Sequence, residues 1–308
     1  MSSPRSILVV AWATLVTQIL IVGTGGAVRL TGSGLGCPTW PLCTDASLVA
    51  TPEMGIHGAI EFGNRLLSII VGIAALALVV LLLVRLRRRY VLVPAVLVLV
   101  LTVLQGVIGG RAVLGQLDPS TVGVHFVVSA VLVALSTVVL VRVIRGPRGD
   151  RVVPRWYAVL AHATSAVVAV TVVVGVLTTG SGPHAGDTAS ARNGLDSELL
   201  QHVHSWPAYL TFALTVLLAF LAVRGRLAPR PFVLAMLAVE VVQIGVGLLQ
   251  ANTGLPPLLV GIHMVLAVIL ISVTTAAVLS LRGSELRAPA EGAAAGRAPR
   301  RGTPASDR

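Results

Sequence analysis

Eight apolar runs divide this chain, and each is about as long as the 20 residues that a helix needs to cross the hydrocarbon core of a bilayer. They lie roughly at 7–26, 61–84, 91–110, 122–143, 156–178, 201–223, 231–250 and 258–281. A segment in lipid must satisfy its backbone hydrogen bonds internally, so we expect each run to be a transmembrane helix. The chain is 55% hydrophobic and only 11% charged, which excludes a soluble domain. The sequence therefore predicts an all-α polytopic membrane protein.

The net charge of +11 would suit a nucleic-acid-binding protein, but the positions of the arginines indicate topology instead. They gather before the first run, after the second, between the fourth and fifth, and after the sixth: Arg5; Arg85, Arg87, Arg88 and Arg89; Arg142, Arg145, Arg148, Arg151 and Arg155; Arg224, Arg226 and Arg230. Cytoplasmic loops are the ones enriched in basic residues. We therefore expect a plasma-membrane protein with both termini in the cytoplasm and no nucleic-acid partner. Residues 283–308, rich in Ala, Gly, Pro and Arg, are predicted to be a disordered cytoplasmic tail.

The chain contains an internal repeat. Segments beginning at Gln105 and Gln243 match without a gap, at a constant offset of 138. Four pairs of identical residues mark the match: Gln105 with Gln243, Gly109 with Gly247, Pro119 with Pro257, and His125 with His263. We therefore predict two tandem four-helix bundles, 1–145 and 146–282. Since each has an even number of helices, both run in the same sense, related by a pseudo-two-fold axis along the membrane normal.

Three histidines fall just inside predicted helices. His204 and His263 begin the sixth and eighth runs, which both enter from the outer face, so their rings can meet at similar depth. His125 has the corresponding place in the first unit. A histidine in a membrane segment is costly and is functional by default, and two at equal depth suit axial ligation of haem iron. The alternative is a structural hydrogen bond to a neighbouring helix.

The first outer loop, "GCPTWPLC", holds the chain's two cysteines, Cys37 and Cys43. Thiols outside the cytoplasm tend to oxidise, so a local disulfide is the leading interpretation. A metal pair is weaker, because no further cysteine completes a tetrahedral site. The residues leave open whether a disulfide here is a loop staple or takes part in redox chemistry.

Taken together, these motifs resemble the haem A synthase family of membrane enzymes. The resemblance runs from about residue 7 to 281 and rests on "VRLTGSGLGCPTWPLC", "IEFGNRLLS", "LQGVIGG", "QIGVGLLQANTGLPP" and the three histidines. It implies the following roles: His204 and His263 as iron ligands of a haem b cofactor, His125 as one ligand of the substrate haem, Glu61 as a catalytic glutamate, and Cys37 with Cys43 as a redox-active disulfide pair.

One position departs from the family pattern. Three residues after Glu61 the commonest family residue is His, and here it is Asn64, an amide that ligates iron poorly. His57, seven residues earlier, could replace the ligand, contact a propionate of the substrate haem, or be a solvated loop residue. Arg65 could pair with a propionate or extend to the outer headgroups. We expect these residues to line the reacting site of the first unit.

The resemblance implies oxidation of the C8 methyl of haem O to a formyl group, giving haem A for terminal oxidases. Its partners would be the haem O synthase and an electron donor, which the sequence leaves open together with the oligomeric state; a homo-oligomer is one state it allows. The rival is a cytochrome b-like di-haem electron carrier, with a quinol as one candidate donor. Upstream of Gln105 the repeat continues at an offset of 140, which sets Asn64 opposite His204. This difference favours the enzyme, because a di-haem carrier is expected to keep both histidine pairs.

Overall fold

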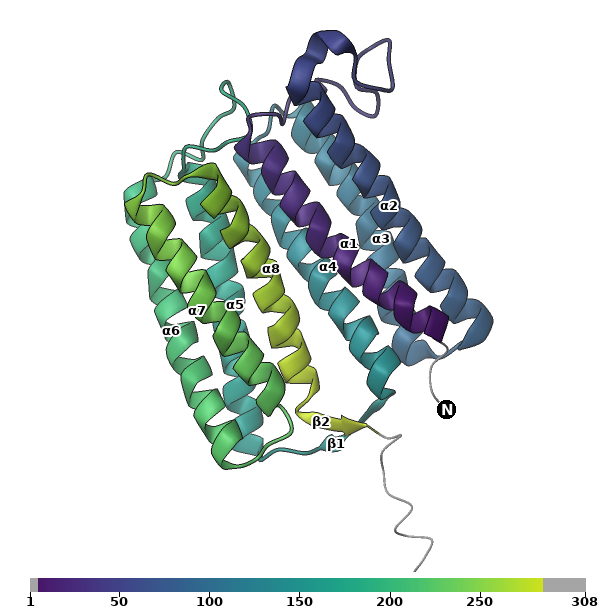
Figure 1. Cartoon of the computed structure of the whole chain (residues 1–308), viewed down its shortest axis with the longest axis vertical. Helices are drawn as coiled ribbons and strands as arrows, with labels where there is room; N and C mark the ends of the chain where they lie inside the picture. Colours follow the sequence, from purple (N-terminus) through teal and green to yellow (C-terminus); the bar gives the residue numbers. More distant parts are fainter. Residues whose placement is uncertain (1–4, 285–308) are drawn as a thin grey trace, which may run out of the picture.

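The computed structural model describes residues 5–284 and is built from eight long helices (Figure 1). They are α1 (Arg5–Leu30), α2 (Gly55–Arg85), α3 (Arg89–Leu114), α4 (Pro119–Arg145), α5 (Arg155–Ser181), α6 (Ser197–Arg224), α7 (Arg230–Asn252) and α8 (Pro257–Leu279). Each is long and apolar enough to cross a membrane. The prediction of an all-α polytopic membrane protein is confirmed. Of the predicted tail, residues 285–308 lie outside the described part of the chain.

Most helices extend several residues beyond their apolar runs, and polar side chains cap two of them, α4 and α6. The Asp118 carboxylate accepts a hydrogen bond from the Thr121 backbone N–H at 2.9 Å and begins α4. Bonds from the Ser120 hydroxyl and from Thr121 lower the pKa of Asp118. Asp196 caps α6 in the same way. At α2, a short 3-10 turn, Pro52–Met54, starts the helix well before the predicted residue 61.

The helices form two side-by-side groups (Figure 1). Helices α1 to α4 pack in a ring, each on its neighbours, and α5 to α8 do the same. Between the groups, α8 packs on α1 and α4, and α4 packs on α5. The core of the first group extends across this boundary, because Val268 of α8 belongs to it. The pseudo-two-fold axis stays a prediction.

Two short strands join the groups at the end opposite the disulfide loop (Figure 1). Strand β1 (Arg148–Arg151) pairs antiparallel with β2 (Arg282–Ser284), so that Arg148 faces Ser284. The Ser284 hydroxyl also donates to the Arg145 carbonyl. The sequence did not predict this sheet. Residues 283 and 284, the first two of the expected disordered tail, belong to strand β2. Segments this short carry no pattern that distinguishes a strand from a loop.

The boundary between α1 and α8 depends on glycine. A Cβ built on Gly23 would lie 3.3 Å from Val265 Cγ2, and one on Gly261 would lie 3.1 Å from Leu30 Cδ1. Such small residues let helix backbones approach closely in lipid, where no hydrophobic force drives helices together. A hydrogen bond of 2.8 Å between the hydroxyls of Thr137 on α4 and Ser272 on α8 adds a polar contact across the boundary.

Replacing Gly23 by Leu should therefore push α1 away from α8 and lower the free energy of unfolding by about 1–3 kcal/mol. Gly25→Leu is the matched control, because a Cβ at Gly25 meets no atom within 4 Å. Thermal unfolding in detergent should show a lower midpoint for Gly23→Leu alone. Equal midpoints for the two variants would contradict a close α1–α8 boundary.

Candidate functional site

The second group brings the rings of His204 of α6 and His263 of α8 close together. Their ring centroids are 6.3 Å apart and the ring planes are 75° apart. The Nδ1 atom of each ring is buried and has no hydrogen-bond partner in this structure. The meeting of these rings was predicted from the sequence, and the structure shows it. Their role as iron ligands stays a prediction.

Glycines on the neighbouring helices make the space for both rings. A Cβ on Gly175 of α5 would lie 2.8 Å from His204 Cε1, and one on Gly247 of α7 would lie 3.2 Å from His263 Cε1. The Gln243 side chain fixes the backbone beneath the second ring, donating to the His263 carbonyl at 3.1 Å. The two imidazoles therefore sit in cradles that any larger residue would fill.

The geometry fits two axial ligands of one haem iron. With a metal–nitrogen bond of about 2.0–2.1 Å, imidazoles on opposite sides of one ion have centroids roughly 6 Å apart. Within residues 5–284, no three His, Cys, Asp or Glu side chains gather where they could hold a bare ion. A site with two histidines needs its other ligands from the bound group, and porphyrin nitrogens supply them.

The first group repeats half of this arrangement. The His125 ring of α4 packs over Gly109 of α3, with 3.4 Å from a built Cβ to Cε1. Gln105 donates to the His125 carbonyl at 2.9 Å, as Gln243 does to His263. The other half differs. Asn64 of α2 accepts a hydrogen bond from the Thr24 hydroxyl of α1 at 2.7 Å, so an amide bound to a neighbouring helix stands where the repeat has a histidine.

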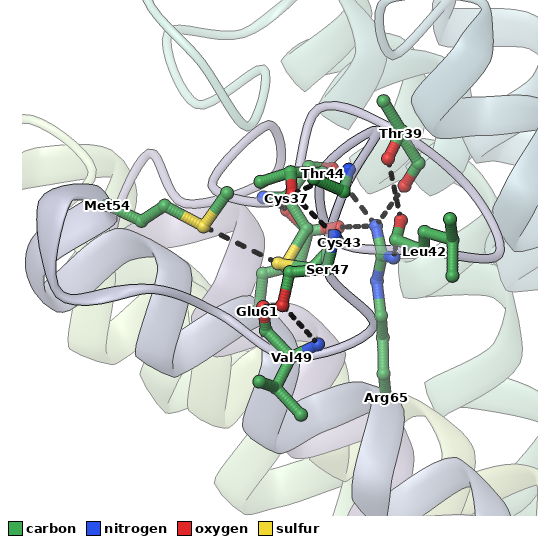
Figure 2. Close-up of a disulfide and its surroundings, with 11 residues drawn as sticks. Cys37, Thr39, Leu42, Cys43, Thr44, Ser47, Val49, Met54, Glu61 and Arg65 are labelled. Atoms are coloured by element: carbon green, nitrogen blue, oxygen red, sulfur yellow. Dashed lines mark hydrogen bonds and ion pairs between the residues drawn. A yellow bond between two sulfur atoms is a disulfide. The ribbon is translucent and has the colours of Figure 1, made fainter.

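Glu61 joins α2 to the outer loop. The residue is buried, only 4% exposed. One carboxylate oxygen accepts the Cys37 backbone N–H at 2.7 Å and the other accepts Arg65 at 2.6 Å. The predicted Cys37–Cys43 disulfide is present. The acid that the sequence marked as catalytic therefore lies directly against the disulfide loop (Figure 2).

Arg65 holds the same loop by its backbone. Its guanidinium donates to the carbonyls of Leu42 at 3.1 Å, and of Cys37 and Thr39 at 3.0 Å each (Figure 2). The sequence predicted a propionate or lipid headgroups as its partner. The partners seen are Glu61 and three loop carbonyls, which sequence reasoning missed because they depend on how the loop folds back over α2.

His57 lies on the first turns of α2 and is exposed. Its Nδ1 is 2.9 Å from the Ser33 hydroxyl. The loop passes so close here that a Cβ on Gly36 would lie 2.3 Å from the His57 carbonyl oxygen. At about 1.5 Å per residue, His57 lies roughly 10 Å outward of Asn64 along the helix. The structure therefore places His57 at the loop contact, away from the level of Asn64.

The remaining buried acid has a structural partner. Glu240 of α7 accepts a hydrogen bond from the Thr215 hydroxyl of α6 at 2.9 Å, which links the two helices. His184, in the loop after α5, has its ring 2.8 Å from the Leu255 carbonyl. His162 is exposed on α5. None of these residues belongs to the His204–His263 pair or to the surroundings of His125 described above.

Arg65→Lys should loosen the disulfide loop, because one ammonium group cannot span carbonyls on both sides of residues 40 and 41. We expect the disulfide to be reduced by dithiothreitol about tenfold faster than in the wild type, corresponding to one lost charged hydrogen bond. Thiol labelling over time measures this. Arg111→Lys, at an exposed arginine on α3, controls for the substitution itself, and equal rates in both variants would contradict the clamp.

Comparison with known proteins places the chain in a family. The family model for the cytochrome oxidase assembly protein COX15-CtaA matches residues 8–275. Proteins named haem A synthase are similar over shorter stretches. That of Exiguobacterium sp. (strain AT1b) is 31% identical over 45% of this chain and 46% of its own length. The Halalkalibacterium halodurans protein is 30% identical over 44% of this chain and 45% of its own length. The Geobacillus kaustophilus protein is 33% identical over 44% of this chain and 42% of its own length.

The matched part is thus slightly under half of each relative. The family model, by contrast, spans nearly all the described residues, and the chain belongs to the cytochrome oxidase assembly protein family COX15-CtaA.

Proposed function

We propose that this protein is a haem A synthase, which oxidises the C8 methyl of haem O to a formyl group and so provides haem A for terminal oxidases. The observation that carries the proposal is the difference between the two units. The second has two facing histidines in glycine cradles, and the first has one such histidine beside an amide and a clamped glutamate. Relatives named haem A synthase support it.

In the second unit, His204 and His263 would hold a resident haem b. With both histidines as ligands, this haem would suit electron transfer rather than oxygen binding. The chain's part is to orient the rings. Gly175 and Gly247 leave room for them, and Gln243 fixes the backbone that carries His263.

In the first unit, His125 would be the one protein ligand of the substrate haem. The Asn64 amide is bound to Thr24 and ligates iron poorly, so the haem would have no second protein ligand here and could take part in oxygen chemistry. We assign His57 to the propionate edge of the substrate, because it lies outward of Asn64 at the loop contact. Dioxygen is the oxidant in this proposal, and the electrons come from a donor outside the chain.

Glu61 would hold and move a proton during the oxidation of the methyl group. A carboxylate offers about four lone-pair positions, and in this structure Cys37 and Arg65 occupy one on each oxygen. Further positions remain for a proton, while the two donors keep the group in a single orientation. Arg65 thus positions Glu61 and the loop together.

We also propose that the protein lies in the plasma membrane with both termini in the cytoplasm. The arginine-rich ends and loops between helices support this orientation, since positive charge marks the cytoplasmic side. The disulfide loop would then face the oxidising side, as its bond requires. The haem O synthase is the expected source of substrate.

Membranes that contain this chain and a source of haem O test the function. Haem A should form, as identified by chromatography and mass, and Glu61→Ala should abolish it while haem b stays bound. Glu53→Ala, at an exposed glutamate in the turn before α2, should keep the activity. Haem b bound with haem O unchanged in the wild type, given a competent electron supply, would instead support the rival electron carrier.

The glycine cradles give a second test, which needs no turnover. Gly175→Ala places a methyl group 2.8 Å from His204 and should lower the haem b content per protein several-fold, because the ring must leave its position. The control is Gly245→Ala on α7, where a Cβ meets no atom within 4 Å. Haem b is measured by the reduced-minus-oxidised absorbance spectrum. Full haem b in Gly175→Ala would remove His204 from the ligand set.

A further inference from the structure

Trp40, in the middle of the disulfide loop, packs directly on α3. A Cβ built on Gly110 would lie 2.4 Å from Trp40 Cδ2 and 2.6 Å from Cε2. The indole therefore rests on the bare backbone of Gly110, and any larger residue would displace it. Trp40 is still 40% exposed, so part of the ring remains available for another contact.

The loop is held so that this contact is fixed. Thr39 and Leu42 flank Trp40 and Pro41, and the carbonyls of both accept hydrogen bonds from Arg65. The disulfide closes the loop on either side. The loop thus bridges from α2, which carries Arg65, to α3, which carries Gly110. The Arg65 guanidinium and the Cys37–Cys43 disulfide together fix the position of Trp40.

The contact lies beside the candidate substrate site. Gly109, the residue before Gly110, is the glycine over which the His125 ring packs. Since consecutive Cα atoms are about 3.8 Å apart, the Trp40 and His125 rings approach within roughly 10 Å of each other across this pair of glycines. A porphyrin bound at His125 is wide enough to reach the indole.

The second unit has no counterpart. The repeat places Leu248 at the position of Gly110, and Leu248 is 53% exposed. The corresponding outer loop, residues 182–196, contains no Trp, Tyr or Phe. The Trp40 indole is therefore a feature of the first unit alone and is not among the features that the two units share.

We propose that Trp40 forms the outer wall of the first-unit site and contacts the porphyrin ring of the bound substrate, so that it sets how tightly haem O is held. The inference rests on the proposed function for the identity of the ligand. An indole offers a flat apolar surface with preferred stacking geometry, and Gly110 with Arg65 determines where that surface stands.

Binding of haem O to purified protein that retains haem b, followed by absorbance titration, tests the wall without turnover. Trp40→Ala should weaken the affinity roughly tenfold, whereas Trp40→Phe should keep most of it. Gly110→Ala should weaken it similarly, because the methyl group displaces the indole without removing it. The controls are Gly106→Ala, one turn earlier on α3 with no atom within 4 Å of a built Cβ, and Trp206→Ala, at a Trp 65% exposed on α6.

Wild-type affinity in both Trp40→Ala and Gly110→Ala would overturn the proposal. So would a weaker affinity accompanied by an equal loss of haem b, because Trp40 would then only support packing. The outcome is separate from that of the synthase assay. A wild-type protein that binds haem O but forms no haem A loses the proposed function, while the Trp40 contact is still decided by the titration.

Discussion

A helix in lipid satisfies its own backbone, so the assembly of eight such helices is decided by where their few polar side chains find partners. Many Thr and Ser hydroxyls bond to carbonyls of their own helix, but several polar side chains have partners on other helices. Gln18 of α1 donates to Thr102 of α3, Thr137 of α4 meets Ser272 of α8, and Thr215 of α6 meets Glu240 of α7. Each bond fixes the rotation of two helices at once. The glycines then set how closely those helices approach, and the histidine cradles form between helices already placed in this way.

The two helix groups share several local features, and small differences distinguish them. The Gln–His backbone bond and the glycine beneath the ring occur in both units. What distinguishes the first unit is Asn64 in place of a second facing histidine, and an outer loop that reaches down onto α2 and α3. In the proposed mechanism, the second unit, which has both histidines, delivers electrons to the first unit, which has Asn64 in place of one of them.

The helices were predictable because length and hydrophobicity decide what enters lipid, and the repeat made the meeting of His204 and His263 predictable as well. The ends of the helices were not, since caps such as Asp118 and the turn before α2 lie outside the apolar runs. The partners of Arg65 were also missed. They are loop carbonyls, which every residue possesses, so no sequence pattern distinguishes them. Trp40 was missed for a related reason, because its contact is with a glycine that has no side chain.

The clamp made by Arg65 has a consequence for how this protein can vary. The guanidinium binds carbonyl oxygens, so its contacts depend on the path of the loop's main chain and not on the loop's side chains. Leu42 is 38% exposed although its carbonyl is held, so many residue types could replace it at that position. The number of residues between the two cysteines cannot vary in the same way. A single insertion or deletion there would shift every carbonyl out of register with the arginine, and homologous loops should differ more in composition than in length.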